Sequence, residues 1–398
     1  MRVLDGIKVL DFGRYIAGPY CAALLGDLGA DVIRIEKREG SEDRYLLPLT
    51  PGKDGATGDG AMFMQMNRNK RSLTLDPMTE EGRRIAHRLA EEADVVIANL
   101  PPATLKAMGL DYATLFAINP RIILTTVSAF GSTGPYADRV GFDGIAQAMC
   151  GAVYLSGTPE QPIKSYAPWV DFGTASLAAF GTMAALYARA QTGRGQEVQG
   201  ALLSTALTFF NFHLIEQAIL KTDRVATLNR SQNSGPSDLF RAKDGFVQIT
   251  INGEPLFRRW AKLLGEPEWI GDPRFASDQA RGDNGEALSA RMQRWFSERS
   301  VAEALSALEA ARIPAGPVYS PQQALDDGHV KAMGLFQDVN YPGLGLPAPV
   351  AGTPVSLSLT PGELRRRPPM LGEHTDEILA AIGIGAEEIA RLRAANVV

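Results

Sequence analysis

Strands and helices alternate along the first third of the chain, and this alternation limits the fold more than any other feature. Short runs rich in Val, Ile and Leu are separated by helical segments, such as the one from about Pro19 to Leu28. We expect buried strands at 7–12, 31–36, 72–75, 93–100 and 121–127. Strands that alternate with helices at this spacing form parallel, doubly wound sheets. The sequence therefore predicts an α/β fold.

A second module follows the first. The stretch 229–237 is polar, contains Gly and Pro and lacks periodicity, which is typical of a linker. We expect a second domain from about Lys221. After the linker, the pattern predicts a strand at 246–251 and helices near 254–264, 285–298 and 301–311. This pattern indicates a smaller α+β module, and 398 residues are enough for two domains.

Charge, cysteine and histidine usage argue against several classes of function. The net charge is −5, so no overall field attracts nucleic acid or an anionic membrane. Cys21 and Cys150 have small and apolar neighbours, which favours buried reduced thiols over a disulfide. The four histidines are scattered singly, so we expect no metal site. Without a leader at Met1 or an apolar run of membrane-spanning length, we expect a cytoplasmic protein.

Two stretches are candidate anion sites. The turn 13–19 lacks the Gly-x-Gly-x-x-Gly spacing of dinucleotide-binding folds, which argues against a nicotinamide cofactor. Gly18 and Pro19 either form a plain tight turn or begin a helix whose free N–H groups face an anion or a carbonyl oxygen. The stretch 67–72 places three cations beside a short strand. Such clusters usually face water, but this one is also placed to bind an anion at a strand edge.

Two acids stand at the start of predicted helices. Asp171 precedes a helix from about Gly173 to Gln191 that is rich in Ala and Gly, and Asp143 lies at the start of a helical stretch near 141–149. Local preference favours a helix N-cap at both, with the carboxylate accepting a backbone N–H of the first turn. The same position also holds a reactive carboxylate firmly beside a cleft. Both interpretations stay open on local sequence.

Eight short motifs, in order along the chain, together resemble the class III coenzyme A transferases. This family includes formyl-CoA transferase, carnitine-CoA transferase and α-methylacyl-CoA racemase. The motifs lie at 6–12, 17–19, 29–36, 69–72, 93–96, 119–121, 192–196 and 371–375. The resemblance implies a large Rossmann-like CoA-binding domain formed by both chain ends, with a smaller domain inserted, and a homodimer of interlocked subunits. The implied boundaries are 1–220, 221–330 and a return segment 331–398.

The resemblance places the family's catalytic aspartate at Asp171. A carboxylate there attacks the thioester of an acyl-CoA donor, giving an acyl-aspartyl anhydride and then an aspartyl-CoA thioester, from which an acceptor acid takes the CoA. CoA is then a substrate, and no permanently bound cofactor is implied. Backbone N–H groups of Ala17 and Gly18 are candidate oxyanion donors. Asp143 keeps the family's acid position as a candidate auxiliary residue.

The same resemblance implies a set of CoA-binding residues. Tyr15, Ile16 and Ala17 approach the pantetheine and the thioester. The nucleotide end is assigned to Lys37, Arg38, Leu75, Asn99, Leu100, Lys106 and Met108, with Lys37 or Arg38 meeting phosphate oxygens. One departure from the family pattern is Ala107, which stands where an arginine is common. The resemblance does not identify the cation that replaces it.

Phe142 favours CoA transfer over racemisation. The racemases of the family have a histidine there, since two-base racemisation needs a proton acceptor on each face of the α carbon. We expect transfer of CoA from a donor, with succinyl-CoA as a candidate, to a small carboxylic or dicarboxylic acid. A free carboxylate of the substrate would pair with Arg44, Arg68 or Lys70. A 2-methylacyl-CoA racemase, a lyase-type activity and a CoA-binding subunit without activity are the alternatives.

Overall fold

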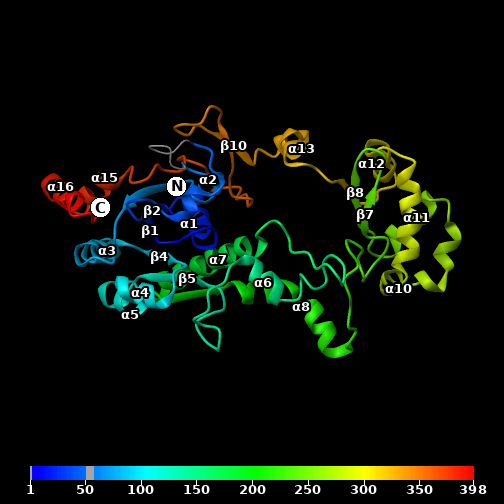
Figure 1. Ribbon diagram of the computed structural model, residues 1–398, viewed down its shortest axis with the longest axis horizontal. Coiled ribbons are helices and arrows are strands. Elements are labelled where there is room, and N and C mark those ends of the chain that lie inside the picture. Colours follow the sequence, from blue (N-terminus) through cyan, green and yellow to red (C-terminus); the bar gives the residue numbers. More distant parts are fainter. Residues whose placement is uncertain (1, 51–57) are drawn as a thin grey trace. The chain divides into compact units, whose positions relative to one another are not determined.

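The computed structural model describes residues 2–50 and 58–398 (Figure 1). Contacts divide the chain into two compact units, each assembled from segments distant in sequence. The large unit comprises Met1–Cys150, Ser165–His213 and Met333–Val398. The small unit comprises Gly151–Lys164 and Leu214–Ala332. In the described ranges no helix combines the length and the apolar character needed to cross a bilayer.

A six-stranded sheet forms the centre of the large unit, and all of its neighbouring strands are parallel. The strand order is β3-β2-β1-β4-β5-β6. The strands are β1 (Lys8–Asp11), β2 (Asp31–Glu36), β3 (Lys70–Thr74), β4 (Val95–Ala98), β5 (Ile123–Ser128) and β6 (Glu197–Ala201). The predicted parallel α/β fold is therefore confirmed. Because β1 and β4 are neighbours while the chain continues from β1 to β2 on the other side, the order reverses between β1 and β4.

Helices cover both faces of this sheet, as the alternating pattern predicts. The helices up to β6 are α1 (Ala17–Asp27), α2 (Ala61–Met66), α3 (Glu80–Glu92), α4 (Pro102–Met108), α5 (Tyr112–Ile118), α6 (Asp143–Met149) and α7 (Trp169–Thr192). Helix α8 (Leu202–Leu220) follows β6, and the return segment adds the hairpin β10 (Phe336–Val339) and β11 (Ala348–Ala351) and helices α15 (Thr375–Ala381) and α16 (Ala386–Ala394).

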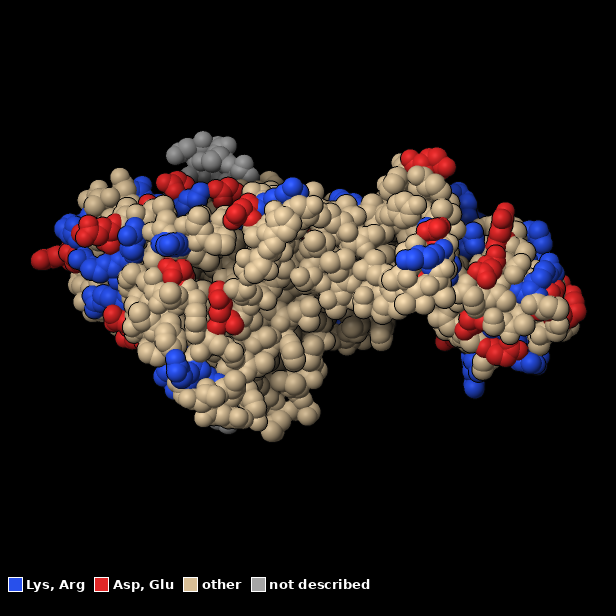
Figure 2. Space-filling view, turned by 90° about the horizontal axis from the view of Figure 1, so that it is seen from below, with Lys and Arg blue, Asp and Glu red and all other residues tan. Residues whose placement is uncertain are grey.

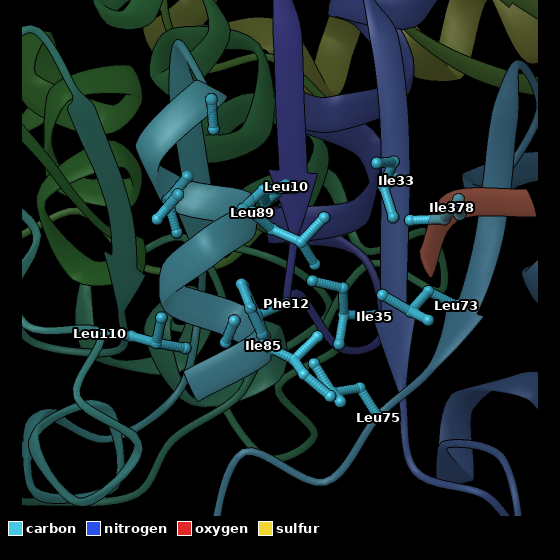
Figure 3. Close-up of a cluster of buried hydrophobic side chains, with 14 of the residues drawn as sticks. Leu10, Phe12, Ile33, Ile35, Leu73, Leu75, Ile85, Leu89, Leu110 and Ile378 are labelled. Carbon is cyan, nitrogen blue, oxygen red and sulfur yellow. The ribbon is translucent and has the colours of Figure 1, made fainter. Parts of the chain in front are cut away.

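On one face, α3 and the return segment bury a continuous apolar core. Ile85 and Leu89 of α3 pack in one cluster with Leu10 and Leu73 of the sheet, and Ile378 of α15 joins it from the end of the chain (Figure 3). Each such side chain contributes about 1.5–3 kcal/mol when fully buried. The C-terminal segment is therefore an integral part of this core.

On the other face, α1 and α7 pack against each other through small side chains. Ala175, Ala178 and Ala185 of α7 are buried, which lets the helix backbone approach its neighbours closely. Thr182 fixes the helix against the sheet through a 2.7 Å hydrogen bond to Thr125. The helix ends at Gly193 in the left-handed conformation, with φ of 73°. The predicted small-residue helix is thus confirmed, with a start four residues earlier than expected.

The small unit is an antiparallel sheet covered by helices. Its sheet consists of β7 (Asp238–Arg241), β8 (Phe246–Ile249) and β9 (Ala315–Pro317). Its longer helices are α9 (Glu254–Leu263), α11 (Gly285–Ser297) and α12 (Val301–Ala310), and the unit also contains the shorter α10 (Asp278–Asp283), α13 (Pro321–Asp326) and α14 (Gly328–Ala332). Trp260, Phe257 and Phe296 are fully buried in its core. The expected strand and three helices are present.

Two of the three cations of the basic stretch 67–72 are buried inside the large unit and paired with buried acids. Lys70 is fully buried, and its Nζ lies 2.7 Å from Asp11. Arg68 is fully buried and lies 2.7 Å from Asp27. For Arg68 and Lys70, both interpretations, a solvated cluster and an anion site, are therefore wrong, whereas Arg71 is partly exposed and pairs with exposed acids. Local sequence could not reveal that these cations are buried, because their acidic partners lie far away in the chain.

Arg44 is buried in the same way. It forms a two-point pair with Glu36, with the closer contact at 2.7 Å, and also contacts Asp59 at 3.0 Å. The expectation that Arg44, Arg68 or Lys70 would pair with a substrate carboxylate is therefore wrong. On the face shown in Figure 2, acidic and basic side chains are intermixed.

Lys70→Met should destabilise the protein strongly, because it removes the closest cation of the buried Asp11 carboxylate and leaves only Arg34, at 3.9 Å. We expect a loss of about 3–5 kcal/mol in the free energy of unfolding, measured by urea denaturation. Lys8→Met is the matched control, since Lys8 on the same sheet forms an exposed pair with Glu92 and should change stability by less than about 1 kcal/mol. Equal losses in the two variants would contradict the proposed importance of the buried pair.

Candidate active site

The predicted CoA-binding residues gather at the carboxyl edge of the parallel sheet. Tyr15, Ile16 and Ala17 follow β1, Lys37 and Arg38 follow β2, Leu75 follows β3, and Asn99 and Leu100 follow β4. Lys106 and Met108 belong to α4, which begins at the same edge. In open α/β sheets, ligands bind outside the carboxyl ends of the strands where the strand order reverses. The order reverses here between β1 and β4, so the turn after β1 and Asn99 lie at that point.

These residues differ in what they offer to a ligand. Lys37, Arg38 and Lys106 are exposed. Lys37 forms a 2.6 Å pair with Glu42, but both side chains are more than half exposed. Such a pair is weak, so the Lys37 ammonium can exchange its partner for a phosphate. The Leu75 side chain, in contrast, is buried in the core cluster, so a ligand meets the backbone at that position.

Asn99 shapes the turn after β1. Its Oδ1 accepts the backbone N–H of Arg14 at 2.7 Å, and its Nδ2 donates to the Arg14 carbonyl at 2.8 Å. A Cβ on Gly18 would lie 3.0 Å from the Gly13 Cα and 3.3 Å from Asn99 Oδ1, so glycine is needed for this close approach. Tyr15 has φ of 60°, an uncommon left-handed conformation for a non-glycine residue. The strand ending in Asn99 was apparent from the sequence, whereas this clamping role was not.

Ala17 and Gly18 are the first two residues of α1, which starts two residues before the predicted Pro19. The first N–H groups of a helix have no acceptor within it, and Ile16 at the N-cap supplies no side-chain acceptor. These N–H groups also lie at the positive end of the helix dipole. The arrangement supports the helix-start interpretation of this turn and suits an oxygen that carries negative charge.

Asp171 is the third residue of α7, so the interpretation of this residue as the helix N-cap is wrong. The N-cap position is held by Pro168, and no side chain of α7 caps the helix start. Asp171 shares a helix face with the buried Ala175 and Ala178, four and seven residues later. Because α7 runs from the carboxyl end of β5 towards the start of β6, this first turn lies at the carboxyl edge of the sheet.

Asp143 caps α7 from a neighbouring helix. It is the first residue of α6, whose own N-cap is Phe142, so the prediction that Asp143 caps its own helix is wrong. Its Oδ2 accepts the backbone N–H groups of Val170 at 2.8 Å and Asp171 at 3.0 Å. A proline at the N-cap has no side-chain acceptor, and the Asp143 carboxylate takes that role.

Burial and the negative charge of Asp143 together raise the pKa of the Asp171 carboxyl to about 7. Over the described part of the chain, no ion pair involving Asp171 is found. A carboxyl group that is partly desolvated, held by a rigid helix and poised near neutral pH is suited to nucleophilic or acid–base chemistry.

Ring contacts join the helix starts to the turn after β1. Phe142 packs edge-on against Tyr15 with ring centroids 5.7 Å apart, and Phe172, next to Asp171, packs against Tyr20 of α1 at 4.9 Å. The starts of α1, α6 and α7 therefore meet at one place. Phe142 brings an apolar ring to this site and no proton acceptor.

Asp171→Asn should stabilise the protein at alkaline pH. The folded-state pKa of Asp171 lies above its unfolded value, so ionisation in the folded state costs stability as the pH rises from about 4 to 7. We expect a gain of roughly 1–3 kcal/mol in the free energy of unfolding at pH 8 that disappears near pH 4. The control is Asp138→Asn, at an exposed loop position. An Asp171→Asn variant that is no more stable than the wild type at pH 8 would contradict the shifted pKa.

Comparison with known proteins identifies the family. Residues 4–375 match the model of CoA-transferase family III. The succinyl-CoA–D-citramalate CoA-transferase of Chloroflexus aurantiacus is 33% identical over 401 residues, which cover 100% of this chain and 98% of that protein. The succinate–glutarate CoA-transferase of Agrobacterium fabrum is 33% identical, with 95% of each chain covered.

A solved crystal structure with a similar fold supports the same family. The crystal structure of a CaiB/BaiF family protein from Brucella suis is 34% identical, superposes with a TM-score of 0.83, and covers 96% of this chain and 99% of its own. The predicted family and the predicted class of enzyme are thus confirmed, and the chain belongs to CoA-transferase family III.

Proposed function

We propose that this enzyme moves CoA from an acyl-CoA donor to a small carboxylic acid with Asp171 as the nucleophile. The observation that carries the proposal is the Asp171 carboxyl group itself. It stands at the carboxyl edge of the sheet, has no cationic partner among the described residues, and has its pKa raised to about 7 by burial and by Asp143. Around neutral pH it ionises to a weakly solvated carboxylate, the form that attacks a thioester.

The proposed reaction proceeds through two anhydrides and one thioester. An Asp171 oxygen attacks the thioester carbon, and the CoA thiolate leaves as the first anhydride forms. The thiolate attacks Cγ of Asp171, and the donor acid departs with one Asp171 oxygen. An acceptor carboxylate attacks Cγ, forms the second anhydride and again frees the thiolate. The thiolate attacks the acceptor's carbonyl carbon, and Asp171 is regenerated with an oxygen from the acceptor.

Backbone and side-chain groups around Asp171 assist these steps. The N–H groups of Ala17 and Gly18 stabilise the oxyanions that form at each attack. Asp143 is an auxiliary residue that fixes the start of α7. Thioesters and anhydrides are both activated acyl compounds, so the exchange keeps the activation without ATP. The scheme requires no metal and no permanently bound cofactor.

CoA is proposed to lie across the carboxyl edge of the sheet. The pantetheine passes Tyr15, Ile16 and Ala17. The exposed cations Lys37, Arg38 and Lys106 meet the phosphates, and Lys106 is the nearest candidate to replace the arginine missing at Ala107. Leu75, Asn99, Leu100 and Met108 form the floor of the nucleotide end.

The acids are proposed to be small dicarboxylates, with succinyl-CoA as donor. The names of the two relatives describe CoA transfer between succinyl-CoA or succinate and the dicarboxylic acids citramalate and glutarate. Because Arg44, Arg68 and Lys70 are buried and paired, a second substrate carboxylate needs another partner.

We further propose an interlocked homodimer, with the large unit serving as the CoA-binding domain. Large apolar side chains are exposed along α7 and the following helix, including Leu177, Phe180, Tyr187, Phe209 and Phe212. Exposed apolar side chains gathered on two consecutive helices are typical of protein interfaces.

Asp171→Ala should abolish CoA exchange. The wild-type enzyme is incubated with succinyl-CoA and a panel of mono- and dicarboxylic acids, and the new acyl-CoA is measured by mass spectrometry. We expect the variant to lose at least about a thousandfold in rate, since the covalent route needs the carboxylate. Asp138→Ala is the surface control. Full exchange by Asp171→Ala would refute the mechanism, and deuterium uptake at the α carbon of a 2-methylacyl-CoA without exchange would indicate a racemase.

A further inference from the structure

Gln147 is a buried polar side chain close to Asp171 that the proposed mechanism does not use. It lies on α6, one turn after Asp143, and is 1% exposed. Its Nε2 donates to Asp143 Oδ1, so the two side chains form one unit. Asp143 is itself 7% exposed. A buried amide is stable only when its hydrogen bonds are satisfied. Its hydrogen-bond partners therefore show which groups it orients.

These two side chains hold the segment that leads into α7 at both of its ends. The Gln147 Oε1 accepts the backbone N–H of Ser165 at 3.0 Å, and its Nε2 also approaches the Ala167 carbonyl at 3.5 Å. The Asp143 Oδ2 accepts the N–H groups of Val170 and Asp171. We name Asp143 and Gln147 the α6 clamp. The clamp grips residues 165–171 at both ends, although Tyr166 between them is almost completely exposed.

An amide meets both requirements of position 147. The side chain must accept from Ser165 and donate to the Asp143 carboxylate at the same time. A glutamate accepts but cannot donate while ionised, and it would place a second carboxylate against Asp143. The other elements at this helix start contribute ring contacts, from Tyr20 of α1 to Phe172 and from Phe209 of α8 to Trp169. The direction of Asp143, and with it the backbone of Asp171, is therefore set by Gln147.

We propose that Gln147 is a positioning residue for the reaction, which orients Asp143 and the segment 165–171 so that the Asp171 carboxylate meets the thioester in a fixed direction. The inference rests on the proposed function of Asp171. A misplacement of about 1 Å at a reacting group can cost on the order of a hundredfold in rate. Gln147 is thus expected to affect the chemical step. CoA is bound by other residues, at the carboxyl edge of the sheet.

The test compares Gln147→Glu with the double variant Asp143→Asn plus Gln147→Glu. In the single variant, the introduced glutamate and Asp143 are two carboxylates that repel each other, and the hydrogen bond between the two side chains of the α6 clamp is lost. In the double variant, the introduced asparagine accepts the two N–H groups of α7 and donates to the introduced glutamate, which accepts from Ser165. We expect Gln147→Glu to lower kcat for CoA exchange by about 10- to 100-fold with KM for the acyl-CoA nearly unchanged, and the double variant to recover most of that loss.

The pH profile separates positioning from a purely structural role. The double variant moves the negative charge one turn further from Asp171, so the acid limb of kcat/KM should shift to lower pH, whereas a change in folding alone leaves the limb in place. Gln147→Met keeps the volume without the hydrogen bonds and should show the same kcat loss if Gln147→Glu does not fold. Gln199→Glu, at an exposed glutamine that accepts from Ser132, is the matched control.

The outcomes are distinct from those that test the proposed function. If the wild type exchanges CoA and Asp171→Ala does not, the function stands. If Gln147→Glu and Gln147→Met then keep the wild-type kcat, or if the double variant fails to recover kcat while it folds and binds CoA, the inference is overturned.

Discussion

The buried ion pair between Lys70 and Asp11 is the interaction on which this sheet edge depends. Asp11 ends β1, and its other oxygen accepts the N–H of Gly13 at 2.8 Å. Lys70 also donates to the carbonyl of Pro19 at 2.8 Å. One pair therefore joins β3, β1, the turn and α1. Breaking a buried pair leaves a poorly compensated charge, so the turn that carries the proposed oxyanion donors is fixed by charges inside the protein.

Two carboxyl groups near this edge show how neighbouring charges shift a pKa in opposite directions. Burial alone would raise the pKa of Glu36, but Arg34 and Arg44 lower it to about 2, and Glu36 stays ionised as part of the framework. Asp171 is also desolvated, yet its charged neighbour is Asp143, and its pKa rises to about 7. The same chemical group thus serves as a permanent structural charge in one place and as a group poised for reaction in another.

The sequence predicted the parallel sheet because apolar strands and amphipathic helices alternate locally, and each strand from β1 to β5 lies where the pattern indicated. Helix capping was predicted wrongly for a physical reason. A carboxylate caps whichever helix start it faces, and Asp143 faces a helix that begins 26 residues later, at Trp169.

The basic stretch was misjudged for a similar reason. Lys70 and Arg68 look like surface cations because their partners, Asp11 and Asp27, lie more than 40 residues away. Gln147 was missed altogether, and its spacing of one helical turn from Asp143 was the signal available. Local sequence therefore specifies the elements well, whereas the partners of polar side chains depend on the tertiary fold.

The central claim, that Asp171 becomes acylated at its own carbonyl carbon, is tested most directly by following oxygen. The enzyme turns over a donor acyl-CoA and an acceptor acid labelled with ¹⁸O in its carboxylate, and is then digested with trypsin in unlabelled water. The tryptic peptide 165–189 contains Asp171 as its only acidic side chain. The mechanism predicts that this peptide gains one ¹⁸O in place of ¹⁶O in a single turnover, and up to two after many turnovers. Complete exchange of CoA with no label in the peptide would contradict it.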